Sequence, residues 1–125
     1  PQPARFWPGG YTAFLAPTLS RAAIFAAMRD RQTYATTERR IYLDVALRGE
    51  ARSRQLHVAG ASEEGICEVA VVLNGEDTRV LVPDGDRRVV VRDDVTVPMG
   101  PTDFCYVRVT TEGGNLAWSS PLWSA

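Results

Sequence analysis

Apolar and polar side chains alternate along much of this chain, and the alternation is clearest between positions 41 and 48. There Ile41, Leu43, Val45 and Leu47 are apolar, as in a strand that buries one face. Turn residues separate further short runs at intervals of about 8 to 12 positions, in residues 56–59, 66–73, 78–82, 87–92 and 103–125. The pattern predicts a mainly β fold, an immunoglobulin-like antiparallel β-sandwich of about seven strands.

The dipeptide Asn74-Gly75 predicts a tight hairpin, because both residues readily adopt the positive φ of the favoured two-residue turn. A two-residue loop there places Val69 opposite Val80. Cys67 then lies on the same apolar face.

The pair Gly113-Gly114 predicts a second hairpin near the end of the chain. With these two glycines as the loop, Val109 lies opposite Trp118, on the face that also carries Cys105. We therefore expect Trp118 to be buried in the core.

A single helix is predicted from Ser20 to about Gln32, in a segment rich in alanine and arginine. Ser20 is placed as the N-cap, where its hydroxyl accepts a hydrogen bond from an amide of the first turn. Ile24 and Met28 fall on one apolar face of this helix.

The predicted strand at residues 11–16 and the helix precede the all-β pattern and do not belong to it. We therefore divide the chain into residues 1–40, the last strand-helix unit of a preceding domain, and the sandwich at residues 41–125. An exposed apolar helix face is unusual on a soluble monomer. We expect either the sandwich or a second copy of the chain to cover it. If a second copy covers it, the chain forms a homodimer.

Composition narrows the classes of partner. The 125 residues carry a formal net charge of −1, so the basic stripe typical of nucleic-acid binders is not expected. No apolar run approaches the length of about 20 residues that a membrane-spanning helix needs. Neither nucleic acid nor a membrane is therefore predicted as a partner.

Few residues suggest metal or acid–base chemistry. His57 is the single histidine, and its position in the 56–59 run places it on the solvent face. The acidic turn at residues 84–86 contains oxygen ligands but lacks the ligand repeat of a calcium loop. We therefore predict no catalytic residue, no metal site and no bound cofactor in this chain.

Two cysteines and two tryptophans are the remaining candidates for a structural or binding role. Cys67 and Cys105 both fall on the predicted inner face, where free buried thiols are expected. A disulfide is the alternative if their Cα atoms approach within about 7 Å. Trp7 and Trp123 could form a sugar-stacking platform, although terminal aromatic residues more often cover an edge or an interface.

Two blocks resemble a known family. Residues 9–47, GGYTAFLAPTLSRAAIFAAMRDRQTYATTERRIYLDVAL, resemble the end of the PHP (polymerase and histidinol phosphatase) domain in a bacterial group of metal-dependent phosphoesterases. The closing segment YVRVTTEGGNLAWSSPLW resembles the end of the β-sandwich that follows the catalytic barrel in that group. The resemblance implies that the metal ligands, several His and Asp residues, lie in an upstream barrel.

The resemblance implies that the chain is a non-catalytic C-terminal β-sandwich that buttresses the PHP barrel of the same protein. On this interpretation the chain alone is not an enzyme, and divalent metals bind only in the upstream domain. The alternative is an independent β-sandwich that binds carbohydrate or a partner protein.

Overall fold

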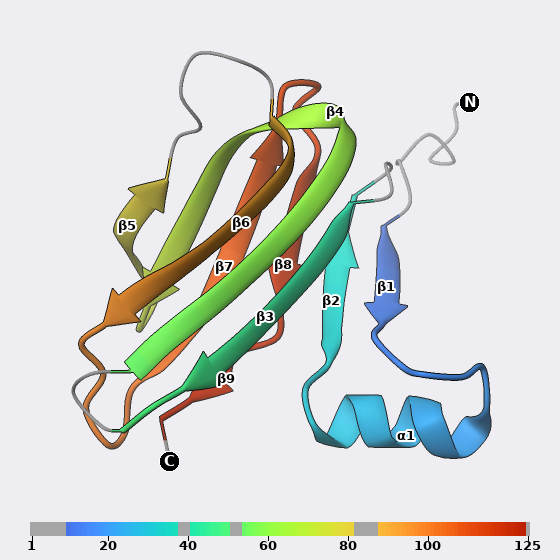
Figure 1. The fold of residues 1–125 in the computed structure, drawn as a ribbon, viewed down its shortest axis with the longest axis horizontal. Coiled ribbons are helices and arrows are strands. Elements are labelled where there is room, and N and C mark those ends of the chain that lie inside the picture. Colours follow the sequence, from blue (N-terminus) through green and yellow to red (C-terminus); the bar gives the residue numbers. More distant parts are fainter. Residues whose placement is uncertain (1–9, 38–40, 51–53, 82–87, 125) are drawn as a thin grey trace, which may run out of the picture.

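The computed structural model describes residues 10–37, 41–50, 54–81 and 88–124. The described part is mainly β, one antiparallel sheet that curls on itself (Figure 1). Its elements are β1 (Tyr11–Phe14), α1 (Arg21–Arg29), β2 (Thr33–Thr36), β3 (Tyr42–Arg48), β4 (Arg54–Leu73), β5 (Glu76–Leu81), β6 (Arg88–Val97), β7 (Phe104–Thr111), β8 (Leu116–Ser119) and β9 (Leu122–Trp123).

Strand β4 organises the sheet. It is 20 residues long, and its first half pairs with β3 and β6, whereas its second half pairs with β5 and β7. The pairings change over between Ala61 and Ile66, where Gly65 has a φ of 86°. The curl of β4 turns its two halves toward each other, so that the strand belongs to both arms of the sheet (Figure 1).

The continuity of β4 differs from the two strands expected at residues 56–59 and 66–73. The first of them was expected to stop at Ala59, yet the strand runs on through Gly60. A Cβ at Gly60 would lie 3.5 Å from the Ile66 side chain and equally close to the Tyr42 carbonyl oxygen. These are ordinary contact distances, and Gly60 pairs with Leu43 on one side and Val91 on the other, so it does not interrupt the strand.

The inward faces of both arms form one apolar cluster. The alternation at residues 41–48 is confirmed, since β3 buries Leu43 and Val45 and leaves Tyr42 exposed. The buried members of the cluster are Ile41, Leu43, Val45, Leu56, Val58, Ile66, Val69, Val71, Val95, Val97, Met99, Cys105, Val107, Val109 and Ala117.

The Asn74-Gly75 hairpin is confirmed at its turn, where both residues have positive φ, 51° and 88°. Its register shifts by one residue further along the β4–β5 pair, so that Val69 lies opposite Leu81. The expected pairing of Val69 with Val80 is therefore wrong. A β-bulge inserts one extra residue on β5, and a bulge leaves no signal in the alternation of short strands.

The hairpin between β7 and β8 has a longer loop than expected. The Thr111 N–H donates to the Asn115 carbonyl at 2.9 Å, which encloses three residues, not two. Gly114 supplies the positive φ of 83° that such loops need. Gly113 leaves room for the Glu64 side chain, which would have to shift because a Cβ there would lie 2.1 Å from its carboxylate.

The extra loop residue reverses the faces of β8. Val109 lies opposite Ala117, and both are fully buried. Trp118 lies opposite Arg108 on the outer face and is only half-buried. The expected burial of Trp118 against Val109 is therefore wrong, because a slip of one residue moves every side chain of a strand to the other face.

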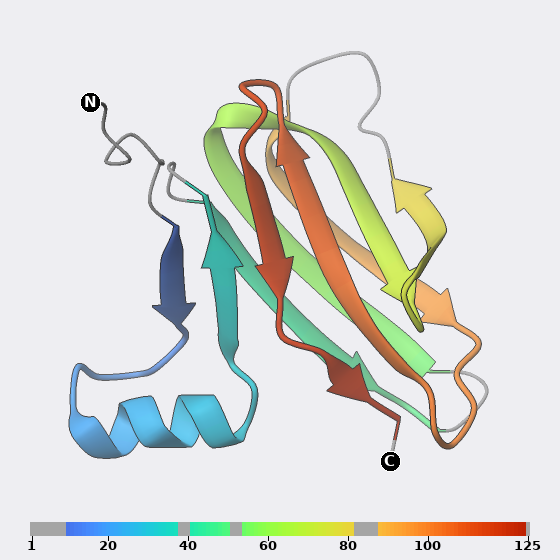
Figure 2. The same ribbon diagram turned by 180° about the vertical axis from the view of Figure 1, so that it is seen from behind.

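The N-terminal unit extends the sheet. β1 pairs with β2, and β2 pairs with β8, which lies between β2 and β7 (Figure 2). The N-cap is confirmed, since the Ser20 hydroxyl accepts from the Ala23 N–H at 3.1 Å. The helix ends at Arg29, earlier than expected, and Arg31 follows with a φ of 60°.

The core that the two arms of the sheet share leads to a prediction about stability. Leu43→Ala should lower the free energy of unfolding by about 2–5 kcal/mol, because it leaves a cavity in the cluster between the two arms. Leu19→Ala is the matched control, since Leu19 is 95% exposed, and should change it by less than about 0.5 kcal/mol. Urea unfolding of both variants measures the difference. Equal effects would contradict this placement of the core.

Candidate functional site

His57 lies on the solvent face of the first half of β4, as predicted. It faces Asp94 on β6, and its Nδ1 lies 2.9 Å from Asp94 Oδ1. Within the described residues, no group of three or more His, Cys, Asp or Glu side chains is placed to hold a metal ion. The acidic turn at residues 84–86 and Trp7 lie outside the described residues.

The two cysteines lie in different environments. Cys105 is fully buried in the core, and burial raises the pKa of its thiol to about 11. Cys67 is exposed at a register shift between Ile66 and Glu68, where its thiol donates to the Thr110 carbonyl at 3.4 Å. The expectation that both face inward is wrong for Cys67, because this bulge turns it outward; both thiols are free.

An ion cluster lies on the outer face of the sheet, and no pattern in the sequence predicted it. Arg108 on β7 donates to Asp77 Oδ2 at 2.8 Å and to Glu68 Oε1 at 3.5 Å. The hydrogen bond to Asp77 is the main reason that the pKa of Arg108 is raised. These residues come from three neighbouring strands and become adjacent only through the register. The cluster lies beside Trp118 and covers the buried Ala70.

Asn74 also ties its hairpin to the start of β7. Its side-chain amide donates to Asp103 Oδ1 at 3.0 Å, and Asp103 Oδ2 accepts from the Gly100 N–H at 2.7 Å. These two hydrogen bonds, that of Asn74 first, hold the pKa of Asp103 below its ordinary value. The Asn74 oxygen accepts from the Phe104 N–H at 3.1 Å, so one side chain holds the turn and the strand together.

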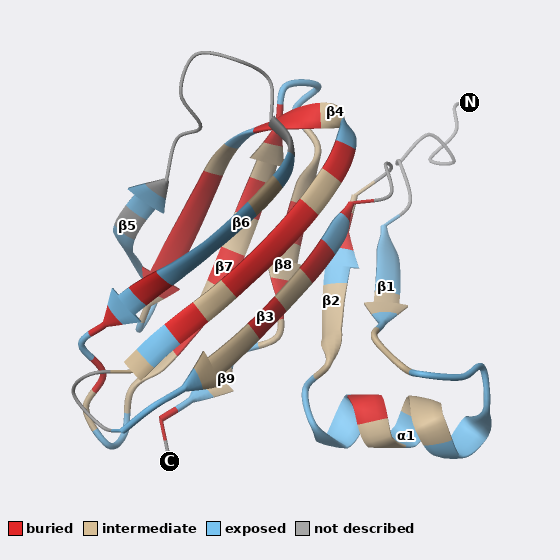
Figure 3. Ribbon diagram, in the orientation of Figure 1, coloured by how far each residue is buried: buried red, intermediate tan, exposed pale blue. Residues whose placement is uncertain are grey.

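The largest exposed apolar side chains of the N-terminal unit form what we call the β1–α1 surface. Its members are Phe14 from β1, Leu19 before the helix, and Phe25 and Met28 from α1; Tyr11 is also exposed but lies on the other face of β1. Phe25 is 61% exposed and Met28 is 53% exposed. Figure 3 shows that α1 is exposed over most of its length. On the helix face that was expected to be covered, Met28 is exposed and Ile24 is half-buried in the single chain.

Within the β1–α1 surface, a groove of about 310 Å³ lies between the end of β1 and the helix. Phe14, Leu19 and Ile24 supply its main apolar walls, together with Pro17. Ile24 is half-buried here, so the groove reaches from the edge of the sheet to the inner side of α1. Its lining suits an apolar side chain.

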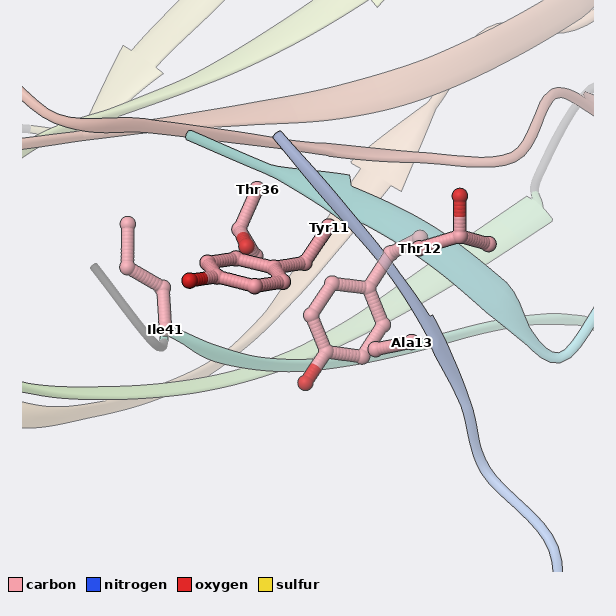
Figure 4. A pocket seen from close by; sticks show the side chains of 6 residues that line it. Tyr11, Thr12, Ala13, Thr36 and Ile41 are labelled. Carbon is pink, nitrogen blue, oxygen red and sulfur yellow. The ribbon is translucent and has the colours of Figure 1, made fainter. Parts of the chain in front are cut away.

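A second pocket, of about 280 Å³, lies on the other side of β1. Tyr11 and Tyr34 both line it, and Thr36 and Ile41 complete its wall (Figure 4). Tyr34 packs against the core, and burial raises the pKa of its hydroxyl, whereas Tyr11 is exposed. Of the two tryptophans predicted to stack on sugars, Trp123 lies in the described chain. Its ring packs on Phe104, with ring centroids 4.9 Å apart.

The described chain contains no helix long and apolar enough to cross a membrane. Its one helix, α1, has nine residues.

Comparison with protein families matches the chain to a family. The model described as "Protein of unknown function (DUF3604)" covers residues 2–71, more than half of the chain. The matched region contains β1, α1, β2, β3 and nearly all of β4.

Relatives occur in bacteria of the genus Chlamydia, and each bears the name "Uncharacterized protein". The relative from Chlamydia muridarum is 30% identical over 139 aligned residues, and that from Chlamydia trachomatis serovar D is 29% identical over 138. Each match covers 91% of this chain and 22% of the relative, so the chain spans about a fifth of the length of these proteins. No solved structure matches the chain.

The two cysteines give a prediction on thiol reactivity. In the native chain at about pH 8, Ellman's reagent should modify Cys67 rapidly, while Cys105 should react only on unfolding. Burial and a pKa of about 11 leave Cys105 both inaccessible and protonated at that pH. Cys67→Ser should abolish the fast reaction, and two fast equivalents in the native chain would contradict the outward turn of Cys67.

Proposed function

Since the chain belongs to the DUF3604 family, whose function is unknown, we propose that it is a non-catalytic β-module that packs through the β1–α1 surface on another domain of a longer polypeptide. Its role is structural, to buttress that domain. Three features support the proposal: the composition of α1, the length of the relatives and the resemblance of residues 9–47.

The composition of α1 carries the proposal. A helix that lies on a soluble protein directs its apolar stripe inward and its polar residues to water. In α1 only Ala27 is fully buried, while Phe25 and Met28 are exposed. Together with Leu19 and Phe14 they form an apolar surface on one unit, and exposed apolar surface of this kind marks an interaction site.

The length of the relatives suggests what covers this surface. More than three quarters of each curated relative lies outside the segment that this chain matches. A domain within the same polypeptide is held at high effective concentration, so even a modest apolar surface suffices to dock it. We therefore place the partner in the same polypeptide and treat self-association of the separate chain as the alternative.

The resemblance of residues 9–47 suggests the nature of that domain. We propose that it is a PHP barrel, and that the curled sheet is a variant of the immunoglobulin-like sandwich that follows such barrels. The single cluster between the two arms of the sheet supports a sandwich-like arrangement. In this proposal metal binding and phosphoester hydrolysis belong to the barrel, because such chemistry needs several convergent His or carboxylate ligands and this chain has one histidine.

Substitution on the exposed face of α1 tests the packing role. The double change Phe25→Ser and Met28→Ser should leave the free energy of unfolding of the separate chain within about 1 kcal/mol, because both side chains already contact water. In the longer polypeptide it should uncouple the module, so that calorimetry shows two unfolding transitions in place of one.

Arg21→Ser is the matched control, since Arg21 is an exposed polar residue on the same helix. It should leave a single transition. If the double variant also unfolds in one transition at the wild-type temperature, the proposed packing surface is wrong.

The pocket beside β1 favours a second candidate function, the binding of carbohydrate. Tyr11 and Tyr34 line one pocket, and tyrosine rings pair an apolar face with a polar tip. For this function, titration with soluble oligosaccharides should shift the NMR signals of Tyr11 and Tyr34, and Tyr11→Ala should weaken binding at least about tenfold, by about 1.4 kcal/mol. Unchanged signals across an oligosaccharide panel would eliminate this candidate.

A further inference from the structure

We propose that β1 is an open docking edge, on which an extended strand from the partner domain of the same polypeptide adds to the sheet. This inference rests on the proposed function, which requires only that the β1–α1 surface be covered. It adds a specific chemistry: the covering segment is a β-strand that pairs its backbone with β1 and inserts an apolar side chain into the groove beside α1.

The hydrogen bonds of β1 show which of its backbone groups are open. In an antiparallel pair, residues bonded to the partner strand alternate with residues whose N–H and C=O groups point away. The Leu15 N–H donates to the Gln32 carbonyl at 2.8 Å, which fixes this alternation along the β1–β2 register. Ala13 therefore bonds to β2, whereas Thr12 and Phe14 direct their backbone groups to the side of β1 on which no described strand lies.

The other side of β2 follows the same alternation. Thr33 lies opposite Phe14, and its carbonyl accepts from the Ser120 N–H at 3.2 Å, on the side of β8. The backbone groups of Thr33 therefore form no hydrogen bonds with those of Phe14. Two independent hydrogen bonds thus agree that Thr12 and Phe14 face outward.

The remaining edges of the described sheet are protected, and β1 is not. Natural sheets protect exposed edges with charged residues, bulges or very short strands. β9 has two residues, and charged side chains occur along the other three edge strands: Asp44 and Arg48 in β3, Glu76 and Asp77 in β5, and Arg92, Asp93 and Asp94 in β6. β1 has the sequence Tyr-Thr-Ala-Phe, with no charge, no proline and no register shift. An unprotected edge favours strand addition.

The groove beside β1 fits a strand that arrives on this edge. Phe14 belongs both to the open edge and to the groove wall, so a segment paired with Phe14 passes directly over the groove. Leu19 and Ile24 then line the space for one apolar side chain. Backbone pairing supplies affinity in such additions, while a side-chain pocket supplies specificity.

Amide hydrogen exchange tests the inference. In the longer polypeptide the amides of Thr12 and Phe14 should exchange at least about tenfold more slowly than in the separate chain, whereas the Ala13 amide should be protected in both. Thr12→Pro removes one outward N–H at an edge position that tolerates proline. It should leave the melting temperature of the separate chain unchanged and remove the protection of Phe14 in the longer polypeptide. Thr12→Val, which keeps the N–H, should preserve that protection.

A parallel measurement of Met28 oxidation separates the two proposals. Fast exchange at Thr12 and Phe14, with Met28 oxidised more slowly in the longer polypeptide, would overturn strand addition and leave the packing role in place. Fast exchange with unchanged oxidation of Met28 would overturn both. Protection that depends on protein concentration would show a second copy on the edge and would also overturn the inference.

Discussion

The fold depends on the continuity of one strand. β4 exchanges backbone hydrogen bonds with β3 and β6 along its first half and with β5 and β7 along its second half. Each half therefore has partners on both sides, and the bend near Gly65 brings the two inward faces onto one apolar cluster. If β4 ended at Gly60, as the chain pattern alone suggests, the two arms would share no strand. Closure of the core is thus a property of a single backbone segment.

The features that the sequence predicts correctly obey local rules. The alternation in β3, the Asn74-Gly75 turn and the Ser20 cap each depend on a few neighbouring residues, and each is found. The errors share another cause. A run of small residues such as Gly113-Gly114 fits a loop of two or of three residues, and only the partner strand decides between them. That choice moved Trp118 from the core to the outer face. Likewise β2 has no strong alternation of its own and is ordered by β1 and β8.

The candidate site likewise combines features that the sequence predicts with features that it does not. The apolar face of the helix was visible in the sequence, and the expectation that something covers it stays a prediction. The Arg108 cluster and the open backbone of Thr12 and Phe14 were not visible, because both arise from strand register. The proposed function therefore depends less on unusual residue types than on which ordinary residues the sheet leaves uncovered. The proposed barrel and the proposed strand addition both assign a partner to that surface.

The position of β2 also has a consequence for the order of folding. β2 lies near the start of the chain but pairs with β8 near its end, and Thr33 and Ser120, whose hydroxyl groups lie 2.6 Å apart, are 87 residues apart in sequence. Contacts of such high sequence separation form late, because a long loop must close first. On a ribosome, β1, α1 and β2 therefore emerge well before the strand that anchors them to this sheet. If the proposed barrel precedes this chain in the polypeptide, docking of the helix on it would come before the sheet is complete.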